Sequence, residues 1–209
     1  NLMMKHAKEL HTYSINFLTD KLRMIDPTKT HIKPVILKGE RIILKPVTLS
    51  GLNDFHEYSL CAKFYQYLEY PPFKNIDESE AYLKKLIERS KSPLQQYWFV
   101  KIIKTGKVIG SFGVNNLNES RKSIEIGYGI SPYYWGKGYF NESANLIIEY
   151  IFKELKIHRI VARTAAFNKA STSGLTKLGF TQEGIMRDYY KDYNGKRLDA
   201  VLFAKLSTD

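Results

Sequence analysis

The sequence predicts a mixed α/β fold of the α+β kind, in which strands and helices do not alternate regularly. Two observations lead to this fold class. Three apolar, β-branched strand patterns follow one another over residues 96–130, with turn signals between them. A strand–helix–strand unit then follows over residues 123–164. A run of antiparallel strands that precedes such a unit is typical of a mixed sheet with flanking helices.

The order of elements in the main part of the chain follows from its hydrophobic periodicity. Strands are expected at residues 40–47, 96–103, 107–114, 123–130, 158–164 and 199–206, the last alone or with one more strand before the turn at Asn194-Gly195. Helices are expected at residues 50–61, 77–90, 138–154 and 169–178. Asp77, with Glu80 three residues later, predicts a capping-box start for the second helix, and Gly179 predicts the end of the fourth.

The first 33 residues are expected to form an extension separate from an enzyme-sized domain at residues 34–209. Apolar side chains at helical spacing predict an amphipathic helix over residues 1–26, which Asp26-Pro27 would end. Residues 27–33 read as a linker. We expect this helix to pack on the main domain or on a second copy of the chain, so a homodimer is one possible assembly.

The composition is that of a globular protein with a hydrophobic core, since 44% of its 209 residues are hydrophobic and 25% are charged. Cys61 is the single cysteine, which excludes a disulfide scaffold and favours a reducing cytoplasm. No run reaches the roughly 18–20 apolar residues of a membrane span, and residues 1–25 carry charges throughout, unlike a secretory signal. We therefore expect a cytoplasmic protein without a membrane partner. The net charge of +11 favours polyanionic partners, although plain solubility explains it equally well.

The stretch "YYWGKGYF" (residues 133–140) places two glycines where a helix is expected to begin. A P-loop would need Ser or Thr after Lys137, where Gly138 stands, and a Rossmann fingerprint would need glycine in place of Asn141. Gly136 and Gly138 still allow the backbone to approach a ligand closely, and the N–H groups of a first helical turn attract anions. These residues alone leave two interpretations open, an anion site to which Lys137 adds charge and a plain loop with turn glycines.

Four segments in order along the chain resemble the GNAT acetyltransferase superfamily. "IGYGISPYYWGKGYFNESANLIIEYIF" is similar to its acetyl-CoA signature, and "RIILKPVTLSGLNDF" to its opening strand and helix. "NKASTSGLTKLGFTQEG" and "NGKRLDAVLFAKL" resemble its later helix and closing strand. Together they cover roughly residues 40–206. The pattern is most similar to the ribosomal-protein N-terminal acetyltransferase (RimJ/RimL-like) branch. The resemblance implies the GNAT acyl-CoA N-acyltransferase fold, a mostly antiparallel twisted sheet with two splayed central strands.

The resemblance also implies which residues hold the co-substrate, acetyl-CoA. In the superfamily the splayed strands admit the pantetheine arm, and the loop and helix start hold the pyrophosphate. Carried over to this sequence, the cofactor-binding residues are Ile130, Trp135, Gly136, Lys137, Gly138, Tyr139 and Asn168. No metal is expected. The chain departs from the pattern at Phe140, where a small residue is usual, so its ring must point away from the phosphates or crowd them.

Two side chains are expected to carry catalysis. Strand alternation places Glu125, Gly127 and Gly129 on one face, which leaves open space above that face. The resemblance implies that Glu125 is the base, directly or through water, whereas the residues alone also fit a solvated glutamate. Asn168 and Ser171 fit an N-cap and its third helical residue. The resemblance further implies that Ser171, or a water that it holds, donates a proton to the leaving thiolate.

Three functions fit the sequence. The first is acetylation of a primary amine, foremost a protein N-terminus of the ribosomal-protein type. The second is acetylation of a small amine such as a polyamine or an aminoglycoside. For either acceptor, the resemblance implies that the aromatic residues of the segment 65–73 help to form the acceptor site, whereas the residues alone also fit plain packing. The third is a non-catalytic acyl-CoA- or nucleic-acid-binding module. The sequence contains no recognised nucleic-acid motif, and it carries Glu125, Asn168 and Ser171 where the family's chemistry needs them, so we expect an enzyme.

Overall fold

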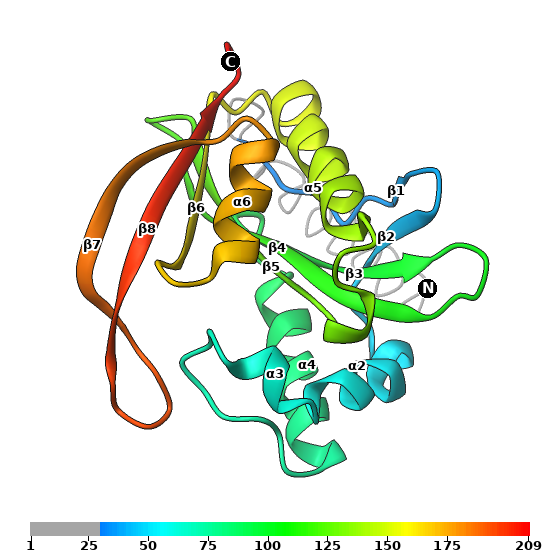
Figure 1. Ribbon diagram of the computed structural model, residues 1–209. Helices are drawn as coiled ribbons and strands as arrows, with labels where there is room; N and C mark the ends of the chain where they lie inside the picture. The colour runs from blue at the N-terminus through cyan, green and yellow to red at the C-terminus, as the bar shows by residue number, and fades with distance from the viewer. Residues whose placement is uncertain (1–29) are drawn as a thin grey trace, which may run out of the picture. The chain divides into compact units, whose positions relative to one another are not determined.

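The computed structural model describes residues 30–209, which form one eight-stranded sheet with helices on both faces (Figure 1). The order of strands across the sheet is β1-β2-β3-β4-β5-β6-β8-β7. The strands are β1 (Leu37–Lys38), β2 (Ile42–Pro46), β3 (Gln96–Ile102), β4 (Val108–Asn118), β5 (Ser123–Ile130), β6 (Arg159–Ala165), β7 (Thr181–Lys191) and β8 (Arg197–Leu206). The helices are α2 (Leu52–Ser59), α3 (Ala62–Tyr65), α4 (Ile76–Arg89), α5 (Tyr139–Glu149) and α6 (Lys169–Lys177).

The sheet opens between its two central strands. Every neighbouring pair is antiparallel except β5 and β6, which run parallel. Their pairing covers residues 123–126 and 159–162 and then stops, so the rest of each strand has no partner in the other. This confirms the expected fold, a mostly antiparallel sheet with a splayed central pair, and leaves a gap through which a ligand can pass.

The helices cover the two faces of the sheet with separate cores. On one face α5 and α6 pack over a core whose largest buried side chains include Trp98 and Phe112. On the other face α2 and α4 pack over a smaller cluster around Phe55 and Phe99. Trp98 and Phe99 are adjacent on β3 and point to opposite faces, as the two-residue period of a strand requires. Both faces are therefore buried at the centre of the sheet, where the site is built.

Most expected elements are present, with informative differences at their ends. α4 begins at Asn75, whose side chain accepts a hydrogen bond from the Glu78 backbone N–H at 3.0 Å, so the predicted cap at Asp77 was placed two residues too late. Glu78 in turn accepts from the Lys74 N–H, one residue before the cap, so the pair is a variant of the capping box. The helix expected over residues 138–154 is α5 followed by a π-helical turn, Tyr150–Glu154. β7 is present as the additional C-terminal strand.

Two short elements were not expected, the strand β1 and the one-turn helix α3. The helix predicted over residues 1–26 lies outside the described residues. Within residues 30–209, no helix is both long and apolar enough to cross a membrane. In that same range, no three His, Cys, Asp or Glu side chains are grouped so as to hold a metal ion.

Candidate active site

A cavity of about 880 Å³ passes through the opening between β5 and β6. On the sheet side it is lined by residues 127–130, the part of β5 that β6 does not pair with. Across the opening it is lined by residues 168–171, at the start of α6. One end reaches the glycine loop before α5, and the other is walled by aromatic residues of α3, α4 and the segment between them. The cavity thus joins the two faces of the sheet.

The glycine loop has the backbone that the sequence suggested. Gly136 and Gly138 have φ angles of 73° and 80°, in the left-handed region that L-residues avoid, and Gly138 is the residue from which α5 starts. The N–H groups of the first turn of α5 have no intrahelical partner and lie at the positive end of the helix dipole. This arrangement favours an anion such as a pyrophosphate.

The side chains next to these glycines hold the loop in place, but not all of them line the cavity. The Trp135 indole N–H donates to the Ile130 carbonyl at 2.6 Å, which ties the loop to the end of β5. The Lys137 ammonium donates to the Tyr133 carbonyl at 3.0 Å and lies 5.2 Å from the centre of the Tyr134 ring. Lys137 is not among the residues that line the cavity, so its charge acts on the loop from outside.

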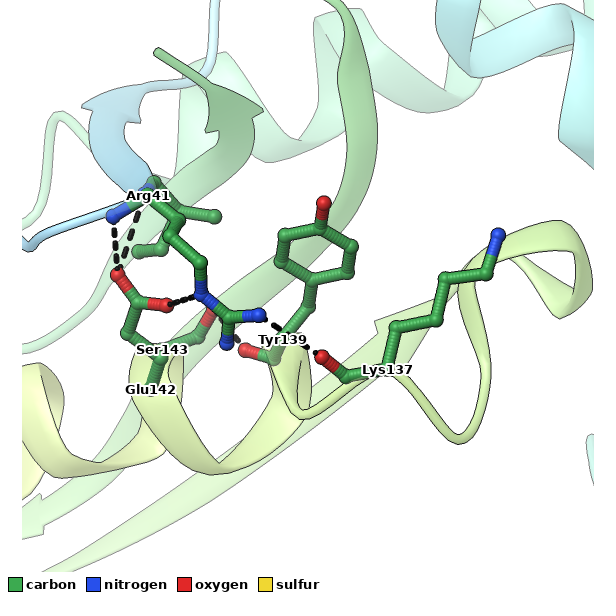
Figure 2. Close-up of polar contacts among 6 residues, drawn as sticks. Arg41, Lys137, Tyr139, Glu142 and Ser143 are labelled. Carbon is green, nitrogen blue, oxygen red and sulfur yellow. Dashed lines mark hydrogen bonds and ion pairs between the residues drawn. The ribbon is translucent and has the colours of Figure 1, made fainter. Parts of the chain in front are cut away.

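An arginine 96 residues earlier in the chain than Lys137 clamps this loop to β2, as Figure 2 shows. The Arg41 guanidinium Nη1 donates to the Lys137 carbonyl at 3.0 Å, and its Nε donates to Glu142 Oε2 at 2.8 Å. The Arg41 backbone N–H donates to Glu142 Oε1 at 2.7 Å. The guanidinium also lies over the Tyr139 ring, 4.9 Å from its centre. Sequence reasoning missed this clamp.

The clamp keeps Glu142 ionised. Partial burial raises the pKa of the Glu142 carboxyl, but the hydrogen bonds from the Arg41 backbone and side chain and from the Ile42 N–H together outweigh burial and hold that pKa below its usual range. A carboxylate in the first turn of α5 also interacts favourably with the helix dipole. The same negative charge would repel a phosphate at the helix start, but Arg41 neutralises it in place.

Phe140 turns into the core and does not crowd the loop. Its ring centre lies 4.6 Å from that of Tyr128 and 6.0 Å from that of Phe112. The ring fits against α6 only because residue 174 is glycine, since a Cβ there would lie 2.7 Å from Phe140 Cε1. Phe140 therefore joins α5 to α6 at the cavity wall and leaves the glycine loop clear.

The start of α6 places one hydroxyl at the opening in the sheet. The Asn168 side chain accepts from the Ser171 N–H at 3.1 Å, so the predicted N-cap is confirmed. The Ser171 and Tyr128 hydroxyls lie 2.8 Å apart and share a hydrogen bond across the opening. Burial raises the pKa of Tyr128, and the hydrogen bond to Ser171 offsets only part of that rise, so the phenol stays protonated. Two neutral hydroxyls thus line the cavity where β5 leaves β6.

Glu125 lies on the expected face of β5 but is held in an ion pair. Its carboxylate accepts from Arg163 Nε at 2.9 Å and from Arg163 Nη2, and it accepts from Asn116 Nδ2 at 2.8 Å. Asn116 occupies a bulge of β4 and has a positive φ of 54°. Glu125 is not among the lining residues, so a proton from an amine in the cavity would reach it only through a carrier such as water.

The structure brings most of the predicted site residues together around this one cavity. The lining residues among them are Ile130, Trp135, Gly136, Gly138, Tyr139, Asn168 and Ser171. Lys137 and Glu125 lie behind that lining. Sequence reasoning missed Arg41, Glu142 and Tyr128. For Glu142 a signal was available, because a carboxylate in the first turn of a helix that should bind an anion calls for a counter-ion.

Comparisons with known proteins agree with this geometry. Residues 41–181 match the family model of the acetyltransferase (GNAT) domain. Over 173 residues the chain is 27% identical to p20 of Bacillus licheniformis, described as an uncharacterised N-acetyltransferase. That match covers 83% of this chain and 97% of the relative. The chain is 34% identical over 104 residues to the ribosomal protein uS5-alanine N-acetyltransferase of Escherichia coli, covering 49% of this chain and 53% of that enzyme. The solved structure of the microcin C7 self-immunity acetyltransferase MccE, in complex with acetyl-CoA and AMP, shares the fold with a TM-score of 0.73 at 23% identity, over 80% of this chain and 93% of that one. Because the family model matches more than half of its length, the chain belongs to the GNAT family of acetyl-CoA-dependent N-acetyltransferases.

Proposed function

We propose that the protein transfers the acetyl group of acetyl-CoA directly to the N-terminal amine of a protein, in the manner of the ribosomal-protein acetyltransferases. The observation that carries the proposal is the cavity itself. It runs from a helix start built for an anion, through an opening in the sheet, to a separate chamber on the other face. A donor and an acceptor can therefore enter from opposite sides. The similarity to the enzyme that acetylates uS5 supports a protein N-terminus as the acceptor.

The donor half fits the chemistry of acetyl-CoA. The loop of residues 135–139 would hold the pyrophosphate through the first N–H groups of α5, which need no particular side chain. The free edge of β5, residues 127–130, would run beside the pantetheine arm. The start of α6, with Asn168 and Ser171, faces that edge across the cavity. Acetyl-CoA supplies a thioester carbonyl for the amine to attack and a thiolate as the leaving group.

The protein's own groups would move two protons in this reaction. The amine attacks in its neutral form, and the C–S bond breaks as the new C–N bond is completed, with no covalent link to the enzyme. Ser171 would donate the proton that the thiolate takes up, and its hydrogen bond to Tyr128 fixes its position. Glu125 would accept, through a water molecule, the proton that the amine nitrogen loses, and Arg163 would hold the carboxylate in place.

A screen of acceptors tests the proposal. Release of CoA from acetyl-CoA is followed with a thiol reagent against N-terminal peptides, polyamines and aminoglycosides, and each product is identified by mass spectrometry. Acetylation at a peptide α-amine is the expected result. Acetylation of the polyamine or aminoglycoside alone would assign the small-amine function instead. RNA binding that weakens with salt, without CoA release from any acceptor, would contradict an enzymatic role.

A further inference from the structure

The chamber on the acceptor side is an aromatic cup. We use this name for six lining residues of α3, α4 and the segment that joins them: Phe64, Tyr65, Tyr67, Tyr70, Phe73 and Tyr82. Five of the rings contact one another, with centres 5.3 Å apart for Phe64 and Tyr65, 5.7 Å for Tyr65 and Tyr70, 6.2 Å for Tyr70 and Phe73, and 5.4 Å for Phe73 and Tyr82. These five rings form one continuous aromatic surface, and Tyr67, whose ring contacts Phe167, lines the same cavity.

The cup rests directly on the glycine face of β5. A Cβ at residue 129 would lie 2.8 Å from Phe64 Cζ, whereas one at residue 127 would meet nothing within 4 Å. Gly127 thus leaves room above the strand, next to the opening in the sheet. An amine held in the cup would reach the reacting centre at this point.

The cup offers an ammonium group no counter-ion. Among the described residues that line the whole cavity, none is an aspartate or a glutamate, and the charged ones are Lys169 and Lys177 of α6. Glu69, in the segment between α3 and α4, and Glu125 of β5 both lie outside the lining. Glu69 accepts from the Lys191 backbone N–H at 3.3 Å, and Glu125 is paired with Arg163. The ring faces attract an ammonium group by about 0.5–2 kcal/mol. Removing an unpaired charge from water costs several kcal/mol, and no lining carboxylate makes up that difference.

The tyrosines of the cup do not supply a negative charge either. Burial raises the pKa of Tyr65 to about 12, and it also raises the pKa values of Tyr70 and Tyr82, each with a smaller contribution from its neighbours. Their hydroxyls therefore stay neutral throughout the pH range of an enzyme assay.

From these contacts we propose that the acceptor is a primary amine flanked by an apolar or aromatic group, such as a peptide that begins with leucine or phenylalanine, and that amines with several positive charges are excluded. An apolar side chain gains by leaving water for the rings, whereas a second ammonium group loses more in hydration than the ring faces return. The same lack of a counter-ion favours the neutral form of the reacting amine, which is the nucleophile. This inference rests on the proposed function and names the substrate class of its acceptor.

A peptide series tests it in the wild-type protein. Peptides that differ only in the first residue, which is leucine, phenylalanine, alanine, aspartate or lysine, are compared with spermidine by kcat/KM for CoA release. The leucine and phenylalanine peptides should exceed the alanine peptide by about tenfold and the lysine and aspartate peptides by more. Equal rates across the series, or a preference for lysine or spermidine, would overturn the aromatic-cup proposal and leave the enzymatic function intact. Failure of every acceptor would overturn the proposed function as well.

A charge placed in the cup gives a second test. Tyr67 is half-buried and lines the cavity, so Tyr67→Asp introduces a carboxylate there. The ratio of kcat/KM for the leucine peptide over the lysine peptide should fall by about tenfold. Tyr193→Asp makes the same change at an exposed tyrosine outside the lining and should leave the ratio unchanged. If Tyr67→Asp does not fold, Tyr67→Ser should still lower the preference for leucine over alanine. An unchanged ratio in a folded Tyr67 variant would contradict the proposal.

Discussion

The contact between Phe140 and Gly174 predicts that Gly174→Ala destabilises the wild type but stabilises a variant with a smaller side chain at position 140. Gly174 lies inside α6, where alanine would ordinarily stabilise the helix by about 0.5–1 kcal/mol relative to glycine. In this protein the new Cβ would lie 2.7 Å from Phe140 Cε1 and 3.2 Å from its Cδ1. Carbon atoms in contact prefer about 3.5–4.0 Å, so the ring must move.

The size of the effect follows from these two opposed terms. Overpacking of a core costs about 1–3 kcal/mol, which exceeds the gain in helix propensity. We therefore expect Gly174→Ala to lower the free energy of unfolding by about 1 kcal/mol. Phe140→Leu removes Cε1 and Cζ, so in that background Gly174→Ala should raise the free energy of unfolding by about 0.5 kcal/mol. The coupling energy between the two positions is then about 1–3 kcal/mol.

Urea unfolding of the wild type, both single variants and the double variant measures this coupling from midpoints at constant slope. Gly184→Ala is the matched control, because a Cβ at Gly184 in β7 meets nothing within 4 Å. Its effect should be the same with Phe140 and with Leu at position 140. A coupling energy between positions 140 and 174 below about 0.5 kcal/mol, the usual error of additivity, would refute the account of how Phe140 packs.

Three further predictions concern the clamp and the catalytic residues. The pKa of Glu142 is lowered in the folded protein, so its stabilising contribution is present above about pH 5 and is lost as the pH falls. The difference in the free energy of unfolding between the wild type and Glu142→Gln should therefore shrink on acidification. A difference that stays constant with pH would contradict the clamp with Arg41. Ser171→Ala should lower kcat by about a hundredfold while the Kd for acetyl-CoA stays the same, and unchanged kcat would remove Ser171 as the proton donor. Glu125→Gln should slow CoA release in the presence of an amine and leave acetyl-CoA binding intact, whereas wild-type turnover would exclude Glu125 as the base.

Local patterns predicted the glycine loop and the start of α6 well, because each of these features is set by a few neighbouring residues. Two glycines with positive φ must precede α5, and Asn168 must cap α6, whatever the rest of the chain does. The strand 96–103 was recognisable because most of its residues are apolar and buried, and the strand 123–130 because its apolar residues alternate with Ser123, Glu125 and two glycines. Features of this kind can be recognised from short stretches of sequence.

Features made by distant residues left at most a partial signal. Glu142 at a helix start calls for a counter-ion, but Arg41 lies 101 residues away and the sequence does not single it out. β7 was expected only as an optional strand, because most of its residues are exposed at the edge of the sheet and it lacks an apolar face. The direction of Phe140 depends on a glycine of another helix. Tertiary packing determines all three features, so hydrophobic periodicity and residue propensity could not predict them.

The claim that residues 135–139 hold the pyrophosphate of acetyl-CoA is tested most directly by calorimetry with two ligands. Gly138→Ala disturbs the helix start at a φ of 80°, whereas Gly106→Ala places the same strain, at a φ of 72°, in the turn between β3 and β4. The account predicts that Gly138→Ala raises the Kd for acetyl-CoA by about tenfold, which is ~1.4 kcal/mol, and that Gly106→Ala does not. Acetyl-pantetheine, which has no pyrophosphate, should bind all three proteins equally. Equal acetyl-CoA affinity in the wild type and Gly138→Ala, or an equal loss for both ligands, would contradict it.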